Sequence, residues 1–346
     1  MTKSILLMKE ELSRALMTIV LDTAEEFVDA ILPTGPYFRM FAPSEWLLFR
    51  GVSRESYKLI PSALRSLAAA QGSGGNAGIP GTDHWKEVIR REARSISQFF
   101  RNLDAGGLPV PGDCNAIRNY LHEYSQDGLL ERDFEEGLIE WPPTELLPLM
   151  GVAQHHGLPT RMLDWTRSAM VAGYFAAFSA AQRNKLGQPH GDRESDNRFS
   201  VWWFSPPTLG LDSRSSTHGG GSFRRLRIVT TPAALNPNLQ AQNGVFTVLT
   251  QRREHLDGVV DATPLHIALE DHPTCRQIRL FTRISAPSTE AGKVLWLLAK
   301  HDIRARSIFP GLDGAARDVI ESSLRKDAYI EGVLRQIADS KDSRSQ

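Results

Sequence analysis

The chain has 346 residues, enough for one large domain with insertions or for two domains of about 150 residues each. Hydrophobic residues make up 41% of it and charged residues 23%, which are globular values and exclude a wholly disordered chain. Lys plus Arg number 40 and Asp plus Glu number 40, so the formal net charge is zero. This balance does not support a nucleic-acid partner held by bulk charge.

Cysteine content and hydropathy indicate where in the cell the chain is expected to be. Cys114 and Cys275 are too few for a disulfide scaffold, which favours a reducing, cytoplasmic location. No uncharged apolar run reaches the length of about 18 residues typical of a membrane span, so no membrane partner is expected. Charged residues interrupt the first twenty positions, which argues against a secretory signal. We expect residues 1–43 to form a helical N-terminal leader.

Three polar, glycine-rich stretches predict surface loops inserted in a single domain. They lie near residues 71–83, 184–198 and 212–222. None of them separates segments of different composition, so one elaborated domain over residues 44–324 is favoured over two independent domains. Residues 325–346 are expected to form a C-terminal helix and a polar tail.

Helices dominate the first part of the chain and strands the later part, which predicts an α+β fold. Thr23 and Glu26 have capping-box spacing and predict a helix that ends at Ile31, before Pro33. Trp46–Phe49 predicts a strand that leads into a turn. By apolar periodicity, further helices are expected at residues 84–103, 117–124, 144–155 with a kink at Pro148, 168–182, 290–301 and 315–324. Further strands are expected at residues 201–204, 226–230, 245–249, 265–269 and 277–284.

The first chemically informative residue is Arg50, which follows an apolar strand and precedes Gly51. This order of residues places a guanidinium group at the edge of a sheet, beside a glycine that has no side chain to shield it. The planar donors of arginine suit a phosphate or a carboxylate. The alternative is a structural salt bridge between Arg50 and a buried carboxylate.

The segment Gln154–Thr166 gathers polar side chains in front of an apolar helix. Thr166 is placed to cap that helix, and the positive end of a helix accepts anions. The alternative is an internal ion pair between Arg161 and Asp164, with Trp165 in the core. Burying such a pair costs several kcal/mol per ion, so it would need a reason to exist. The candidate substrate-binding residues here are His155, His156, Arg161, Trp165 and Thr166.

Two further polar features complete the set of candidates. The amides of Gln242 and Asn243 precede Gly244 and a strand, and they can read a polar ligand through paired donors and acceptors. The alternative is a β-turn of a hairpin through Asn243 and Gly244. On a helix the adjacent His155 and His156 point about 100° apart, so no metal site is expected.

At these segments the chain resembles the bacterial FRG domain, which is named for its Phe-Arg-Gly motif. The resemblance extends from about Ser44 to Leu324 and implies an architecture more readily than a reaction. It is carried by Trp46–Gly51, Leu59–Ser62, Gln154–Thr166, Val171–Ala176, Gln242–Phe246 and Ile308–Ala315.

The chain is also similar, in fewer features, to ADP-ribosyltransferases. These have an Arg or His on a first strand, a Ser- or Thr-bearing strand that leads into an apolar helix, and a Glu near a later strand. The similarity implies a mostly antiparallel, ADP-ribosyltransferase-like strand core. Its catalytic candidates are Arg50, Asp164 and Gln242. Gln242 stands where the family has Glu, so the carboxylate that stabilises an oxocarbenium charge would come from Asp164 or Asp313.

Two functions remain open on this basis. The first is an enzyme that binds and cleaves NAD or a related nucleotide, which would suit a toxin or a phage-defence effector. NAD would then be a substrate, and no bound cofactor is expected. The second is a non-catalytic module that senses a nucleotide or a peptide, or in which the polar residues form a buried structural network. A protein acceptor is not identified by the sequence.

Overall fold

The structure, a computed structural model, describes most of the predicted domain. The inserted stretches at residues 71–83 and 212–222 lie outside the described part, as does the start of the predicted leader. The described residues are 15–39, 41, 46–65, 84–124, 128–187, 194–209, 225–232, 236–253, 262–270, 272–276, 278–325 and 330.

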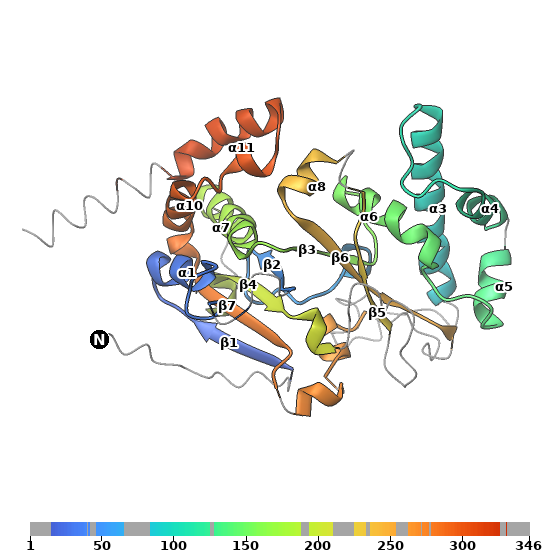
Figure 1. Cartoon of the computed structure of the whole chain (residues 1–346), viewed down its shortest axis with the longest axis horizontal. Coiled ribbons are helices and arrows are strands. Elements are labelled where there is room, and N and C mark those ends of the chain that lie inside the picture. The colour runs from blue at the N-terminus through green and yellow to red at the C-terminus, as the bar shows by residue number, and fades with distance from the viewer. Residues whose placement is uncertain are drawn as a thin grey trace, which may run out of the picture.

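A curled seven-stranded sheet forms the centre of the described part (Figure 1). Its strand order is β1-β7-β4-β2-β3-β6-β5. The edge strand β1 runs parallel to β7, and the other neighbouring strands pair antiparallel. The mixture of this sheet with helices supports the predicted α+β class. The strands are β1 (Leu16–Val20), β2 (Leu48–Val52), β3 (Met162–Thr166), β4 (Arg198–Phe204), β5 (Arg225–Val229), β6 (Gly244–Thr250) and β7 (Phe281–Pro287).

Two groups of helices pack on the two halves of the sheet. Helix α7 contacts β2 and β4 and packs with α1 and α10, while α6 contacts β3 and β5 and packs against α3. The helices are α1 (Ala24–Ile31), α3 (His84–Ala105), α4 (Asn115–Glu123), α5 (Leu129–Glu135), α6 (Leu147–His155), α7 (Ala169–Lys185), α8 (Pro237–Ala241), α9 (Leu265–Ala268), α10 (Ala291–Lys300) and α11 (Ala305–Ile308), and residues 312–325 are also helical. Short 3-10 turns occur at Ser62–Leu64, Thr144–Leu146, Glu194–Asn197, Pro206–Leu209, Pro273–Arg276 and Ser288–Glu290.

Two predicted elements differ in kind from the structure. Leu16–Val20, expected to belong to the helical leader, forms strand β1, because the edge of β7 supplies backbone partners and buries Leu16 and Ile19. Residues 265–269, expected to form a strand, instead contain the short helix α9. A short apolar run fits both structures by its pattern, and Pro264 directly before it favours a helix start.

The helix starts confirm one local prediction and correct two others. The capping box between Thr23 and Glu26 is confirmed at the start of α1. Pro148 does not kink a helix, because it lies in the first turn of α6, where its missing N–H is not needed. Helix α7 is capped by Ser168, whose Oγ accepts from the Val171 N–H, and not by Thr166.

Gly51 lets α7 lie directly on β2. A Cβ at this position would lie 2.0 Å from the Ala172 carbonyl oxygen and 2.9 Å from the Ala176 nitrogen. No side chain fits in that space, since both atoms belong to the backbone of α7. The glycine of the Phe-Arg-Gly motif is therefore explained by packing, and the arginine before it remains to be explained.

Candidate functional site

The sheet parts between β2 and β3. A single residue pair, Phe49 with Thr166, joins these strands in the described residues, whereas every residue of β2 pairs with β4. Past that pair, the side chain of Arg50 crosses the gap. Its Nη1 donates to the carbonyl oxygen of Asp164 at 2.6 Å and lies 3.4 Å from Asp164 Oδ2. We call this gap the seam.

Gln154, at the C-terminal end of α6, connects the seam to two loops. Its Nε2 donates to Asp164 Oδ2 at 3.1 Å. Its Oε1 accepts from the Thr160 N–H at 3.1 Å, from Thr160 Oγ1 at 2.9 Å and from Ser62 Oγ at 3.4 Å. Arg50, Asp164, Gln154, Thr160 and Ser62 thus form one hydrogen-bonded group, which we call the seam cluster.

The seam cluster is buried at one end and open to solvent at the other. The side chain of Asp164 is 48% exposed, whereas that of Arg50 is 14% exposed. Both bonds to the carboxylate end on Oδ2, and within the described part of the chain Oδ1 has no hydrogen-bond partner. The carboxylate is therefore held in one orientation and still presents an oxygen to solvent.

Positive charge exceeds negative charge at the seam. Burial is the main cause that lowers the pKa of Arg50, the nearby Arg65 lowers it further, and Asp164 opposes both. Arg65 is exposed, and its Nε donates to the Ile60 carbonyl oxygen at 3.3 Å. Arg50 therefore lies within the electrostatic influence of a second guanidinium group as well as of the Asp164 carboxylate.

His155 adds an imidazole beside this charge. Burial lowers its pKa, the neighbouring His156 lowers it further, and Asp164 partly opposes them. The His155 ring is therefore neutral at neutral pH and able to accept a proton. His156 is exposed, and its ring stands edge-on to that of His155 at 5.5 Å.

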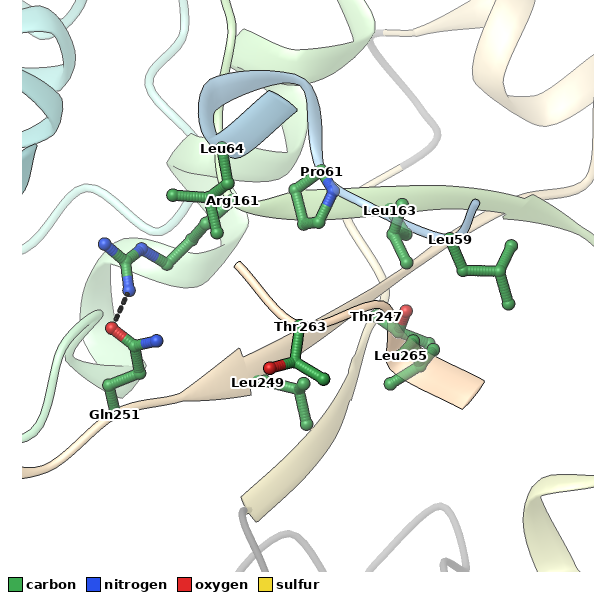
Figure 2. Close-up of a pocket in the computed structure, with 10 residues that line it drawn as sticks. All are labelled: Leu59, Pro61, Leu64, Arg161, Leu163, Thr247, Leu249, Gln251, Thr263 and Leu265. Carbon is green, nitrogen blue, oxygen red and sulfur yellow. Dashed lines mark hydrogen bonds between the residues drawn. The ribbon is translucent and has the colours of Figure 1, made fainter. Parts of the chain in front are cut away.

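Arg161 directly precedes β3, and its side chain lies on the face of the sheet opposite to that of Asp164, because side chains alternate along an extended chain. It is 2% exposed, and its Nε donates to Glu92 Oε2 at 2.7 Å, with Nη2 bound to the same oxygen. Its Nη1 donates to Gln251 Oε1 at 2.9 Å, as Figure 2 shows. The predicted alternative partner, Asp164, is thus replaced by Glu92.

The same face of β3 holds a small cavity, and Arg161, Leu163 and Gln251 are among its lining residues (Figure 2). Its volume of about 30 Å³ has room for a water molecule and none for a nucleotide. The predicted role of Arg161 in substrate binding therefore has no support in this position, where its donors already hold Glu92 and Gln251.

Trp165 and Thr166 also make internal contacts. Trp165 is buried, and its Nε1 donates to Thr247 Oγ1 at 2.8 Å. Thr166 Oγ1 donates to the Gln242 carbonyl oxygen at 2.6 Å and accepts from the Ser168 N–H at 3.0 Å. These bonds fix the end of β3 and the start of α7.

Gln242 and Asn243 lie near the seam, beyond the end of β3. The Gln242 amide donates to the Ile308 carbonyl oxygen at 3.3 Å. Thr166, which binds its main chain, is two residues from Asp164, or about 7 Å along the strand. Asn243 is exposed, has a positive φ of 48° and joins α8 to β6, so its turn does not belong to a hairpin.

The structure therefore joins two of the three catalytic candidates, Arg50 and Asp164, and places Gln242 nearby through Thr166. Three members of the site, Gln154, Ser62 and Arg65, are not among the candidates that the sequence predicts. Gln154 and Ser62 stand in the motifs that carry the family resemblance, which was the signal available for them. For Arg65 no sequence signal was present, because only folding brings it close to Arg50.

Two further properties of the described residues concern metal ions and membranes. Among those residues, no group of three or more His, Cys, Asp or Glu side chains is placed to hold a metal ion. Over the same residues, every helix is too short or too polar to cross a membrane.

Comparison with known proteins identifies one domain. Residues 45–185 match the family model of the FRG domain, so the chain contains an FRG domain. The matched range includes the whole seam cluster, whereas Gln242 lies beyond it. No curated protein and no solved structure matches the chain.

Proposed function

With an FRG domain over residues 45–185 as the premise, we propose that the chain binds a nucleotide at the seam, through its phosphate and ribose groups. The supporting observation is the carboxylate of Asp164, which is held on one oxygen by Arg50 and Gln154 and is half exposed on the other side. NAD is the ligand to test first, because the sequence is similar to ADP-ribosyltransferases at Arg50 and at the strand bearing Asp164.

The two guanidinium groups supply the phosphate contacts. Arg50 uses Nη1 for Asp164, and among the described residues its Nε and Nη2 have no hydrogen-bond partner. Arg65 adds a second, exposed positive charge close by. Arginine binds phosphate through pairs of planar N–H donors, so a diphosphate between Arg50 and Arg65 would have one guanidinium group for each of its two negative charges.

Asp164 supplies the ribose contact. A carboxylate oxygen accepts hydrogen bonds from ribose hydroxyls, and Asp164 Oδ1 is open for this purpose. Because Arg50 and Gln154 hold the other oxygen, the carboxylate needs little reordering when the ligand arrives. Gln242, near Thr166, is placed to extend the polar surface along β3.

Hydrolysis of NAD is the second step of the proposal, favoured by a neutral His155 beside the Asp164 carboxylate. The bond between ribose C1′ and the nicotinamide nitrogen breaks, and its electron pair neutralises the nicotinamide ring. Asp164 stabilises the positive charge that develops on the sugar. Water attacks C1′ and passes one proton through His155 to solvent, which yields nicotinamide, ADP-ribose and a proton. A toxin or phage-defence effector would use such an activity.

Two alternative functions of the same residues predict different results in the binding and cleavage experiment described next. In a nucleotide sensor the ligand binds and is not cleaved. In a purely structural network, Ser62, Thr160 and Gln154 serve only to hold Asp164, and no nucleotide binds.

The test measures NAD binding by calorimetry and nicotinamide release by the wild type and two variants. Asp164→Asn removes the charge and should weaken NAD binding by about ten- to a hundredfold and abolish release. Asp104→Asn is the control, because Asp104 is also half exposed and paired with an arginine, Arg118, at 2.9 Å. Folded wild type that binds neither NAD nor ADP-ribose would refute the proposal, and binding without release would support the sensor.

A further inference from the structure

A surface cavity of about 470 Å³ lies against helix α3. Figure 1 shows this helix with α4 and α5 on the side of the molecule away from α7. Ligand cavities in proteins span about 300–1,000 Å³, so this one has room for a small molecule. We call it the α3 cavity. Its described lining residues are Arg94, Ser95, Ser97, Gln98 and Arg101 of α3 and Tyr124, which follows α4.

The spacing of residues along α3 brings two arginines to the same side of the helix. Arg94 and Arg101 are seven residues apart, which is two helical turns or about 10.5 Å along the axis. Gln98 lies between them, and its Oε1 accepts from Arg101 Nη2 at 3.5 Å. All three residues are exposed. Because arginine side chains are long, both guanidinium groups can reach one ligand in the cavity.

The lining of the α3 cavity is rich in hydrogen-bond donors. Its described residues carry two guanidinium groups, three hydroxyls and one amide, and none of them carries a carboxylate. Burial raises the pKa of Tyr124, so its hydroxyl stays protonated at neutral pH. That hydroxyl donates to Asp133 at 3.4 Å, and Asp133 is itself paired with Arg132 at 2.9 Å. Such a lining suits an anion.

Arg101 has donors available for a ligand. Arg118, on the neighbouring helix α4, already binds the carboxylates of Asp104 and Asp113. By contrast, the Nε and Nη1 of Arg101 have no hydrogen-bond partner within the described residues. The charge of Arg118 is therefore balanced inside the protein, whereas that of Arg101 is available to a ligand.

Ser97 provides an independent sign of a ligand. It is only 5% exposed and lines the cavity, and across the described part of the chain its Oγ has no hydrogen-bond partner. A serine within a helix can donate to the carbonyl oxygen four residues earlier, and this one does not. A buried polar group without a partner is destabilising. We therefore expect the Ser97 hydroxyl to bind a group inside the cavity.

We propose that the α3 cavity binds a small phosphorylated molecule, whose phosphate lies between Arg94 and Arg101 and accepts a hydrogen bond from Ser97. A phosphate group carries about two negative charges and three acceptor oxygens, which matches two guanidinium groups and a hydroxyl. The cavity is larger than a phosphate group, so the remaining space holds the organic part. The site is separate from the seam, because no residue of the seam cluster lines it.

The first experiment locates the ligand on the full-length protein by chemical modification. Phenylglyoxal reacts with exposed guanidinium groups, and peptide mass spectrometry gives the rate at each arginine. Adenosine monophosphate should slow the modification of Arg101 about tenfold at ten times its dissociation constant. Arg91 is the internal control, because it is exposed on the same helix and does not line the cavity. Its rate should not change.

Several other compounds define what the cavity recognises. Adenosine, which lacks the phosphate, should leave Arg101 unprotected. The proposal is overturned if adenosine monophosphate, glucose 6-phosphate and pyrophosphate all fail to protect Arg101. Protection by single-stranded RNA and by none of these small phosphates would assign the cavity to a nucleic acid instead. Protection that disappears in Asp164→Asn would place the ligand in the seam and would also overturn the proposal.

The second experiment measures binding of the protecting phosphate by calorimetry in three variants. Arg101→Gln should raise the dissociation constant at least about tenfold, and Ser97→Ala about three- to tenfold. Arg91→Gln is the matched control, because it removes the same charge from the same helix, and it should change the constant less than about twofold. Equal effects of Arg101→Gln and Arg91→Gln would show attraction by general charge and overturn the proposal.

The stability of Ser97→Ala separates a binding role from a structural one. Alanine removes a buried hydroxyl that has no partner, so this variant should unfold at the same denaturant concentration as the wild type or a higher one. Weaker phosphate binding in a protein of equal or greater stability supports the assignment of Ser97 to the ligand. Unchanged binding in this variant would exclude Ser97 from the site.

Discussion

Arg50 Nη1 lies 2.6 Å from the main-chain oxygen of Asp164, so a side chain joins the two halves of the sheet where backbone pairing stops. A buried carbonyl group needs a donor, and β2 supplies one here from a guanidinium group instead of an amide. Arg50 therefore has two separable tasks. One hydrogen bond, to the Asp164 carbonyl oxygen, joins β2 to β3. The other contact orients the Asp164 carboxylate, which we propose binds the ligand.

Substitution at the two ends of this contact should separate stability from binding. Arg50→Met removes both bonds and leaves the Asp164 carbonyl without its donor, so the free energy of unfolding should fall by about 2–3 kcal/mol. Asp164→Asn keeps the main-chain carbonyl and should cost less than about 1 kcal/mol. Urea denaturation of the two variants measures the difference. Equal losses in both variants would contradict this division of tasks.

Gly51 should tolerate no side chain. In Gly51→Ala the added Cβ would lie 2.0 Å from the Ala172 carbonyl oxygen, so α7 must move, and we expect a loss of about 3 kcal/mol or more. Gly173→Ala is the control within α7 itself. There the nearest atom is the flexible end of Ile31 at 2.5 Å, and alanine favours the helix, so the loss should stay below about 1 kcal/mol. Thermal denaturation ranks the two variants, and a reversed order would be evidence against the packing argument.

The buried pair of Arg161 and Glu92 should contribute strongly to stability when only one partner is removed. Arg161→Met leaves the Glu92 carboxylate buried without its cation, and the expected loss is about 3–5 kcal/mol. Adding Glu92→Gln neutralises that charge while keeping an acceptor for Trp141 Nε1, so the double variant should be more stable than Arg161→Met alone. A double-mutant cycle by chemical denaturation measures the coupling.

An exposed ion pair provides the comparison for that cycle. Lys293 Nζ lies 2.8 Å from Glu25 Oε1, and both side chains are substantially exposed. Lys293→Met should therefore cost less than about 1 kcal/mol, because solvent already screens the pair. A cost as large as that of Arg161→Met would show that burial is not the reason for the difference.

Stability should decline in mild acid because of His266. Its ring is buried 5.0 Å from that of Trp202, and burial, with Arg283 and Lys58, lowers its pKa from 6.5 to about 4. Between these values the unfolded chain binds a proton that the folded chain does not, so the free energy of unfolding falls as pH falls. The loss from this residue is complete near pH 4 and reaches about 3 kcal/mol.

The matched variant for this prediction is His266→Gln, which cannot take up the proton. Its absolute stability changes at every pH, so the informative quantity is the slope of unfolding free energy against pH. Between about pH 4 and 6.5, the folded and unfolded pKa values of His266, we expect a smaller slope than in the wild type. Above pH 6.5 we expect equal slopes. Denaturant titrations at several pH values check this, and parallel curves throughout would contradict the assignment to His266.

Local sequence determined the elements whose signals are local. The capping box of Thr23 and Glu26 specifies the start of α1, because both partners lie within one helical turn. The long apolar period specifies α3, and the Phe-Arg-Gly and Gln154–Thr166 motifs identified the domain and two members of its seam cluster, Arg50 and Asp164.

Tertiary structure decided everything that depends on distant partners. Leu16–Val20 is a strand because β7, over 260 residues later, offers its edge, and no local pattern records that. The partner of Arg161 is Glu92 on α3, and the groups that hold the Asp164 carboxylate come from β2 and α6. Motifs name the polar residues of a site, but only packing decides which face of β3 each occupies, because neighbouring side chains on a strand point in opposite directions.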